Sequence, residues 1–335
     1  PAYIIGIDLG TTNTVVSYTA AQSAPGTAPE IKIFEIPQLV AAGVVEKRTV
    51  LPSFVLLPGP HDVSAGALAL PWDSRSRIAV GEYARDRGAE IPHRLVASAK
   101  SWLCHDMVDR NAAILPWGST DNGAKLSPVG ASAEILSHIR KAWNHEIAGS
   151  DAALRLENQE VLLTVPASFD AVARELTVQA AAKAGMPGII LLEEPQAAFY
   201  AWIESQGDGW RRLVSRGDRV LVCDVGGGTS DFSLIRVEAE QGELVLERVA
   251  VGNHLLVGGD NMDLALAYAV ARRLDAGGQK LDEWQMRGLW HSCRSAKEKL
   301  LAAGGNESFP VTVLGRGSRL IGGTLTSELD THDVI

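Results

Sequence analysis

The sequence has few residues of the kinds that mark disulfide scaffolds, metal clusters or membrane spans. Its 335 residues include three cysteines, Cys104, Cys223 and Cys293, and no pair of them has metal-ligand spacing. We therefore expect buried thiols in a reducing compartment. No signal peptide is recognisable, and no apolar run is long enough to span a bilayer. These absences predict a cytoplasmic protein.

Basic residues are scarce relative to acidic ones. The chain has 31 lysines and arginines against 40 aspartates and glutamates, a formal net charge of −9, and no basic stripe. This balance argues against general binding to nucleic acid or to anionic membranes. The hydrophobic share of 46 % is typical of a soluble globular protein. The length suffices for two domains or for one large bilobal domain.

Strand-like and helix-like segments alternate along the chain, which predicts an α/β fold. Asp170 as an N-cap and Gly185 as a C-cap delimit one predicted helix. Loops are expected at 20–30 and 58–76, and a turn at 257–260. Strands are expected at 3–8, 15–18, 160–166, 189–192, 244–251 and 309–314, and helices at 126–147, 170–185, 194–205, 261–274 and 284–303.

Two distant stretches share one design, in which a strand, a turn of small residues and a second strand follow each other. The first, "DLGTTNT", begins at Asp8, and the second, "DVGGGTSD", begins at Asp224. Aligning the two aspartates also aligns Gly10 with Gly226. Such a repeat predicts two related lobes that each carry the same hairpin.

The composition of these turns is suited to phosphate. Turns of small residues expose consecutive backbone N–H groups that can bind an anion, and glycine lets the backbone approach it closely. A carboxylate beside a phosphate repels it unless a divalent cation lies between them, and Mg²⁺ is commonly held through its waters. Two facing hairpins would hold one polyphosphate. An ordinary hairpin turn is the alternative for the first stretch taken alone, because Gly, Thr and Asn are common turn residues.

Further motifs resemble those of the heat shock protein 70 chaperones, a family within the actin-like ATPase superfamily. "IGIDLGTTNTVVS" (5–17) and "CDVGGGTSDFSL" (223–234) are similar to the two phosphate motifs of that family. "LTVPASFD" (163–170), "EEPQAAF" (193–199) and "GGDNMD" (258–263) match other family motifs in the same order. Because the ordered set covers nearly the whole chain, the sequence resembles a divergent member of this family.

The resemblance implies an α/β actin-like ATPase fold. Two lobes, each a mixed β-sheet with flanking helices (duplicated ribonuclease-H-like units), would surround a nucleotide cleft. Lobe I would comprise 1–190 with an insertion near 38–125, and lobe II 191–335 with an insertion near 258–325. The peptide-binding domain and the second adenosine motif of the family are not found here, so we expect a C-terminally truncated member.

The resemblance also implies a role for each motif residue. Asp8 and Asp224 would hold Mg²⁺ through water. Glu194 and Asp231 would orient the attacking water and the hydrated metal, and Thr229 would assist catalysis. The residues implied to bind ATP or ADP are Gly10, Thr11, Thr12, Asn13, Gly226, Gly227, Gly228, Thr229, Gly258, Gly259 and Lys297. Pro166 and Arg174 occupy the positions of a relay between nucleotide state and the neighbouring domain, with a solvated Arg174 as the alternative.

The chain departs from the family at two places. In "VGEYARDRG" (80–88), Arg85 stands where the resemblance implies a catalytic lysine. The arginine guanidinium is larger than a lysine ammonium and differs in geometry, which predicts slow hydrolysis. A surface arginine in a shifted loop is the alternative. In the adenosine-binding helix Lys297 is retained, but Glu298 replaces an arginine and cannot make that residue's cation–π contact with adenine.

These features predict a Mg-dependent ATPase domain of a heat shock protein 70-like chaperone, whose nucleotide state controls a separate substrate-binding domain. The implied partners are client polypeptides, a co-chaperone and a nucleotide exchange factor, with no nucleic acid or membrane. One alternative is a non-catalytic nucleotide-sensing or scaffolding module, favoured by Arg85 and Glu298. Another is a sugar-kinase-like phosphotransferase, although no sequence feature marks a catalytic aspartate in a carbohydrate pocket.

Overall fold

The structure is a computed structural model. It describes residues 1–22, 29–105, 107–119, 123–240, 243–253, 255–303, 307–313 and 324–334. The expected strand at 309–314 therefore extends by one residue outside the described part. Among the described helices none combines the length and apolar character needed to cross a membrane.

The larger sheet carries the first hairpin. Its strands are β1 (Tyr3–Leu9), β2 (Asn13–Ala20), β3 (Lys32–Ile33), β6 (Leu51–Pro52), β10 (Glu160–Val165) and β11 (Ile190–Glu193). The order is β11-β10-β1-β2-β3, with β6 also paired to β2. The strand β1 is antiparallel to β2 and parallel to β10, so this sheet is mixed, as predicted.

Two long helices build the core against this sheet. They are α3 (Pro128–Trp143), with Ser127 as N-cap, and α4 (Ala171–Lys183), with the predicted Asp170 as N-cap. Ile5 and Ile7 of β1 are fully buried with Trp143 of α3. Burying each such side chain contributes about 1.5–3 kcal/mol to the stability of this core.

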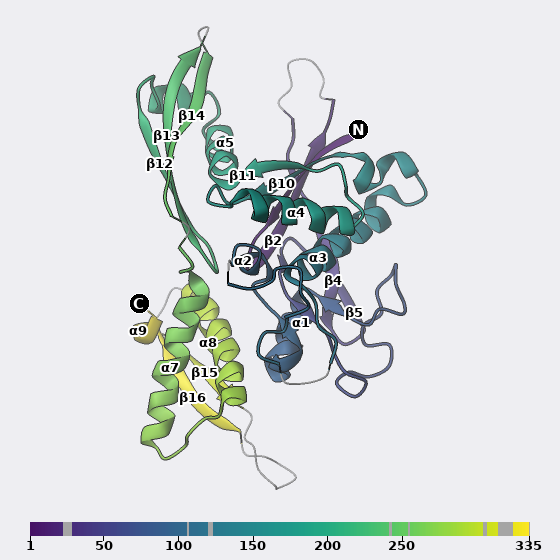
Figure 1. Ribbon diagram of the computed structural model, residues 1–335, viewed down its shortest axis with the longest axis vertical. Helices are drawn as coiled ribbons and strands as arrows, with labels where there is room; N and C mark the ends of the chain where they lie inside the picture. The colour runs from purple at the N-terminus through teal and green to yellow at the C-terminus, as the bar shows by residue number, and fades with distance from the viewer. Residues whose placement is uncertain are drawn as a thin grey trace.

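Between β3 and α3 the chain forms a group of short elements. They are β4 (Ile36–Ala41), β5 (Val44–Arg48), β7 (Val55–Leu56), β8 (Ala79–Val80), α1 (Glu82–Glu90), β9 (Leu95–Val96) and α2 (Ala99–Trp102). The expected irregular stretch at 58–76 consists of turns and bends. Figure 1 shows α2 facing the second half of the molecule.

The second hairpin belongs to another sheet, formed by β12 (Arg219–Val225), β13 (Ser230–Glu240) and β14 (Glu243–Val251). The predicted mixed sheet is wrong here, because all pairings in this sheet are antiparallel in the described residues. Consecutive strands joined by hairpins must run antiparallel, and a parallel strand would need a crossover. Cys223 on β12 is exposed rather than buried, whereas Cys293 is buried as expected.

The helices α5 (Glu194–Gln206) and α6 (Trp210–Leu213) connect the two sheets. After β14, α7 (Gly259–Ala276) and α8 (Glu283–Ala303) pack with β15 (Ser308–Val313) and β16 (Leu325–Asp330), and α9 (Thr331–Val334) follows. These elements have a core of their own. Figure 1 shows them below the β12–β14 sheet. The helix α7 begins at Gly259, inside the turn expected at 257–260, because Asn261 accepts a hydrogen bond from Gly258 N at 2.9 Å.

A buried histidine makes the first core sensitive to acid. His138 on α3 is 5 % exposed, and its Nε2–H donates to the Pro37 carbonyl at 2.9 Å. Burial, reinforced by nearby Lys141, lowers the pKa of His138 from 6.5 to about 4 despite that hydrogen bond. In the unfolded chain His138 therefore takes up a proton near pH 6.5, whereas in the folded chain it stays neutral until the pH approaches about 4. Stability is lost as the pH falls from 6.5 toward 4.

We expect His138→Gln, which retains an N–H donor for Pro37, to lose less stability between pH 7 and pH 4. The difference from the wild type should approach about 3 kcal/mol, the free energy that corresponds to the lowered pKa. Urea unfolding at several pH values measures it. His61→Gln, at an exposed histidine, is the control and should keep the wild-type pH dependence. Parallel pH profiles for the wild type and His138→Gln would contradict the prediction.

Candidate functional site

The tips of the two hairpins touch, although they lie on different sheets. A Cβ atom on Gly227 would lie 2.2 Å from Thr12 Cγ2, and one on Gly228 would lie 2.7 Å from Thr11 Cγ2. Both distances are below any ordinary contact, so these positions have room only for glycine. The structure thus brings together the two turns that the sequence repeat singles out.

Each tip is held by backbone hydrogen bonds. In the first, the Thr12 carbonyl accepts from Ser53 N at 2.8 Å, and β2 begins at Asn13, so this turn is shorter than predicted. In the second, Gly226 N donates to the Thr229 carbonyl at 2.8 Å. These bonds fix the turns and present the tips to each other.

The "GGDNMD" segment lies against the second tip. Gly259 N donates to Gly226 O at 3.1 Å, and Asp260 N donates to Gly227 O at 2.6 Å. A Cβ on Gly258 would lie 2.6 Å from Gly226 O, so the close approach requires glycine. Three of the sequence motifs therefore meet at one place.

Three carboxylates lie near the tips. Asp8 is the next-to-last residue of β1 and accepts from Thr164 Oγ1 at 2.8 Å, while Asp224 occupies the corresponding place on β12. Glu194 begins α5 with a side chain that is 15 % exposed. Burial raises the pKa of Glu194, the charges of Asp224 and Asp8 raise it further, and pairing with Lys100 opposes the shift. The charges of both aspartates therefore act on Glu194.

The carboxylates suit a hydrated cation. Within the described ranges, no three His, Cys, Asp or Glu side chains converge as a direct ligand group. Mg²⁺ keeps several of its waters in many protein sites and needs one or two carboxylates. Asp8 and Asp224 are the residues that would hold such an ion through water, and its anionic partner would lie beside the two tips.

Asp231 lies directly opposite Asp224 in the β12–β13 ladder. It is 5 % exposed, and Ser168, which follows β10 of the first sheet, donates its Oγ–H to Asp231 Oδ1. The predicted site residue Thr229 is half-buried in the adjoining turn. Asp231 thus connects the second hairpin to the first sheet.

Lys297 lies beside Gly259 but is already engaged. Its Nζ contacts Asp263 Oδ1 at 2.6 Å and donates to the Gly259 carbonyl at 3.1 Å. One turn earlier, the buried Arg294 pairs with Asp263 at 2.8 Å and with Asp260 at 2.5 Å. This network of α7 and α8 holds the glycine pair against the second tip.

Arg85 is not placed at the tips by its described contacts. Its Nε pairs with Asp86 Oδ1 at 2.8 Å. It lines a cavity of about 900 Å³ between α1 and α8, with Glu298 on the opposite helix. Both unusual positions of the sequence thus border one hollow.

Arg174 is bound rather than solvated. It donates to Glu193 Oε1 at 2.8 Å and to the backbone carbonyls of Phe169 and Ala167, which follow β10. Glu193 also pairs with Arg248 of β14. The side chain therefore ties α4 to the loop that follows Pro166 and, through Glu193, to the second sheet.

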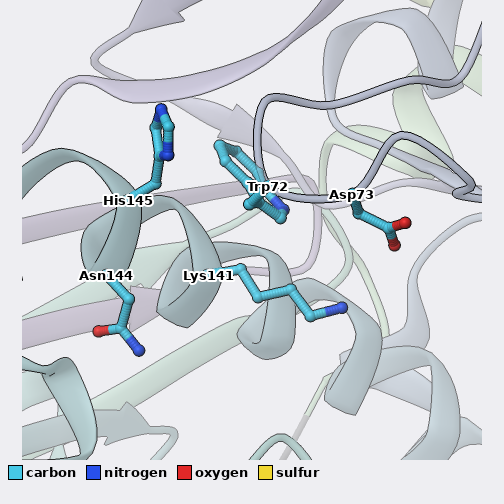
Figure 2. A pocket seen from close by; sticks show the side chains of 5 residues that line it. All are labelled: Trp72, Asp73, Lys141, Asn144 and His145. Atoms are coloured by element: carbon cyan, nitrogen blue, oxygen red, sulfur yellow. The ribbon is translucent and has the colours of Figure 1, made fainter. Parts of the chain in front are cut away.

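A second pocket does not include any predicted site residue. Figure 2 shows this hollow of about 320 Å³, where Trp72 lies between Asp73 and His145, with Lys141 and Asn144 on the adjoining helix. The ring centroids of Trp72 and His145 are 5.7 Å apart. Its lining comes from one turn of helix and one loop and lacks the converging carboxylates of the hairpin site.

Sequence reasoning missed the contribution of α2. Lys100 Nζ pairs with Glu194, and Lys100 is 9 % exposed. Ser101 Oγ lies 3.5 Å from Thr11 Oγ1 and would lie 2.6 Å from a Cβ on Gly228. The stretch "SAKSW" matches no motif that we recognised. The one signal in the sequence was charge balance. A site predicted to place three carboxylates beside a polyphosphate needs a nearby cation.

Small-residue turns from two sheets meet in this α/β protein, and the charges of an aspartate next to each turn act on Glu194. The chain belongs to the Hsp70 protein family, whose sequence profile matches residues 46–320. It is 30 % identical over 281 residues to a chaperone protein HscA homolog of Actinobacillus pleuropneumoniae, covering 83 % of this chain and 39 % of that protein.

Other relatives give the same result. A chaperone protein HscA homolog of Pseudomonas aeruginosa is 30 % identical over 313 residues, which cover 88 % of this chain and 42 % of that protein. The chaperone protein HscA of Serratia proteamaculans is 31 % identical over 294 residues, covering 82 % and 39 %. The chain thus spans about two-fifths of the length of these relatives.

The contact between Thr12 and Gly227 can be tested directly. Gly227→Ala places a methyl group in the space that Thr12 occupies, so we expect the tips to separate. Amide hydrogen exchange at 10–13 and 226–229 should then accelerate by roughly tenfold or more, while the buried core keeps its protection. Hydrogen exchange with mass spectrometry measures both regions.

Gly188→Ala is the matched control, because a Cβ at that position has no heavy atom within 4 Å. It should leave exchange at both tips unchanged. Adding Thr12→Gly to Gly227→Ala restores the space and should slow the exchange again. Unchanged exchange at the tips in Gly227→Ala would show that they do not touch.

Proposed function

We propose that this chain is the ATP-binding and ATP-hydrolysing domain of an Hsp70-type chaperone. The observation that carries the proposal is the contact of the two glycine turns beside Asp8, Asp224 and Glu194. A polyphosphate beside the touching tips would be within reach of backbone N–H groups from both sheets. Membership of the Hsp70 family and the similarity to proteins named as chaperones support it.

In this proposal Asp8 and Asp224 would hold hydrated Mg²⁺ through its waters, and the ion would supply positive charge beside the β- and γ-phosphates. Glu194 then acts as the proton acceptor for the attacking water. Its raised pKa suits that role, because a base works best when its pKa lies near the operating pH. Asp231, fixed by Ser168, orients the water, and most of the rate enhancement comes from positioning and charge neutralisation.

We further propose that the nucleotide state is transmitted along the contacts between the sheets. Ser168 reaches Asp231, and Arg174 shares Glu193 with Arg248. A change at the γ-phosphate would shift these contacts and thereby a separate substrate-binding part, whose partners would be client polypeptides, a co-chaperone and an exchange factor. Lobes at 1–190 and 191–335 fit this proposal, and so does a cytoplasmic location.

One observation favours a second function, that of a non-catalytic nucleotide sensor. Arg85, in the place where the resemblance implies a catalytic lysine, pairs with Asp86 and faces the cavity beside α8. A site without its phosphate-directed cation would bind ATP but turn it over slowly. Binding and hydrolysis must therefore be measured separately.

We expect the wild-type chain to bind ATP with Mg²⁺ and to bind it much more weakly with EDTA. Asp8→Asn and Asp224→Asn should each weaken binding of MgATP by roughly tenfold or more, because each removes one charge from the metal site. Thr229→Ala should lower phosphate release more than binding. Isothermal titration calorimetry and a single-turnover phosphate assay provide the two measurements.

Asp275→Asn, at an exposed aspartate of α7, is the control and should match the wild type. A wild-type chain that binds no ATP in the presence of Mg²⁺ would overturn the proposed function. Binding of ATP without release of phosphate would favour the non-catalytic nucleotide sensor over the hydrolase as the function of this chain.

A further inference from the structure

We propose that the cavity between α1 and α8 holds the base of the bound nucleotide, and that Glu298 makes this site prefer guanine to adenine. The inference rests on the proposed function, because it assumes that the phosphates of the same nucleotide lie at the hairpin tips. It names the base that the site selects, and it gives Arg85 and Glu298 a shared role.

The cavity borders the segment that contacts the second tip. Arg294 lines the cavity and pairs with Asp260 at 2.5 Å, and Asp260 N donates to Gly227 O at 2.6 Å. Lys297, three residues further along α8, donates to the Gly259 carbonyl at 3.1 Å. A nucleotide whose phosphates lie beside the tips can therefore extend its ribose and base along α8 into this cavity.

The size of the cavity suits a nucleoside. Its volume is about 900 Å³, and small-molecule sites usually measure about 300–1,000 Å³. Trp284 of α8 and Pro92 after α1 add apolar surface to its lining. The hollow beside Trp72 and His145 measures about 320 Å³, and none of its lining residues belongs to the tips. A nucleotide bound at the tips therefore has space for its base between α1 and α8.

Two opposite charges line the two walls of the cavity. Arg85 lies on α1 and Glu298 on α8, and the charge of Glu298 acts on Arg85. Arg85 pairs with Asp86 through Nε, at 2.8 Å, and in the described residues its two terminal nitrogens have no partner. Glu298 is exposed and forms no ion pair within the described ranges. A pair of donors and a carboxylate are thus both available to a ligand.

A carboxylate distinguishes guanine from adenine by the edge of the base. Guanine presents two adjacent donors, N1–H and the 2-amino group, to which the two oxygens of one carboxylate can bind side by side. Adenine presents an amino donor beside an acceptor nitrogen, whose lone pair would face the negative charge of Glu298. On the other wall, the terminal nitrogens of Arg85 can donate to O6 and N7 of guanine, a contact that arginine commonly makes with that base. Guanine therefore matches both walls.

A buried donor also supports occupation of the cavity. Arg294 is 4 % exposed, and its Nε and Nη2 are paired with Asp263 and Asp260. Its Nη1 is buried and has no hydrogen-bond partner among the described residues. A buried donor without an acceptor destabilises the folded chain by roughly 1–3 kcal/mol or more. An oxygen atom of a nucleoside in this cavity would supply the acceptor.

The test compares four ligands by isothermal titration calorimetry in the full chain: MgATP, MgGTP, MgITP and magnesium tripolyphosphate. We expect MgGTP to bind roughly 5- to 30-fold more tightly than MgATP, the lower part of the range for a bidentate contact to a base, because Glu298 is exposed to water. Inosine keeps N1–H and O6 but lacks the 2-amino group, so MgITP should lie between them. Equal affinities, or a preference for MgATP, would overturn the proposal.

Glu298→Gln tests the carboxylate. An amide side chain offers a donor and an acceptor and matches the edge of adenine rather than that of guanine. The ratio of the affinities for MgGTP and MgATP should therefore fall by roughly tenfold or more, while tripolyphosphate binds as in the wild type. Glu283→Gln, at a glutamate in the first turn of α8 whose side chain is 84 % exposed, is the control and should keep the wild-type ratio.

Thermal unfolding monitors the fold of each variant. A uniform loss of all four ligands in Glu298→Gln would make Glu298 a structural residue and overturn the proposal.

Arg85→Gln separates the base from the phosphates. A contact of Arg85 with guanine predicts that this variant weakens MgGTP by roughly fivefold or more and leaves tripolyphosphate unchanged. An equal loss of MgGTP and tripolyphosphate would place Arg85 at the phosphates and refute its contact with the base.

Failure of the proposed function gives a different result. A wild type that binds neither tripolyphosphate nor any of the three nucleotides refutes the phosphate site and both proposals with it. A wild type that binds tripolyphosphate and all three nucleotides with one affinity keeps the phosphate site and refutes the selection of guanine alone. Hydrolysis does not enter this comparison, because only affinities are measured.

Discussion

The contact between the two glycine turns is the constraint on which the site depends. Thr12 occupies the space that a side chain at Gly227 would need, so the tips of two different sheets come within van der Waals distance. Each tip is also anchored to its own sheet by backbone hydrogen bonds. Because a larger residue at Gly227 or Gly228 would push against Thr12 or Thr11, glycine is what allows the two turns to approach this closely.

This approach also concentrates negative charge, which the surrounding structure has to offset. Asp8 and Asp224 each lie one residue before the end of their strands, β1 and β12, and the charges of both act on Glu194 at the start of α5. Lys100 supplies the compensating ammonium, while Arg294 and Lys297 do the same for Asp260 and Asp263. Carboxylates packed this closely destabilise the folded chain unless a cation accompanies them. Their mutual repulsion therefore favours the binding of a positively charged metal ion.

Local patterns accounted for much of the fold. The cap at Asp170, the apolar spacing in α3 and the two hairpins were all visible in the sequence because they depend on neighbours a few residues apart. The antiparallel character of the second sheet and the start of α7 at Gly259 were missed. The hairpin connections exclude a parallel neighbour, and the hydrogen bond from Gly258 N to Asn261 lets α7 begin two residues before the expected start at 261.

By itself the sequence determined the chemical inventory of the site: two small-residue turns, an aspartate before each, and the order of motifs that places the chain in the Hsp70 family. Tertiary structure decided which charges meet. It set Lys100 on Glu194, turned Arg85 toward Asp86, and bound Arg174 to Glu193. The physical reason is that a turn is specified by its own residues, whereas an ion pair across 94 residues of chain depends on how separate elements pack.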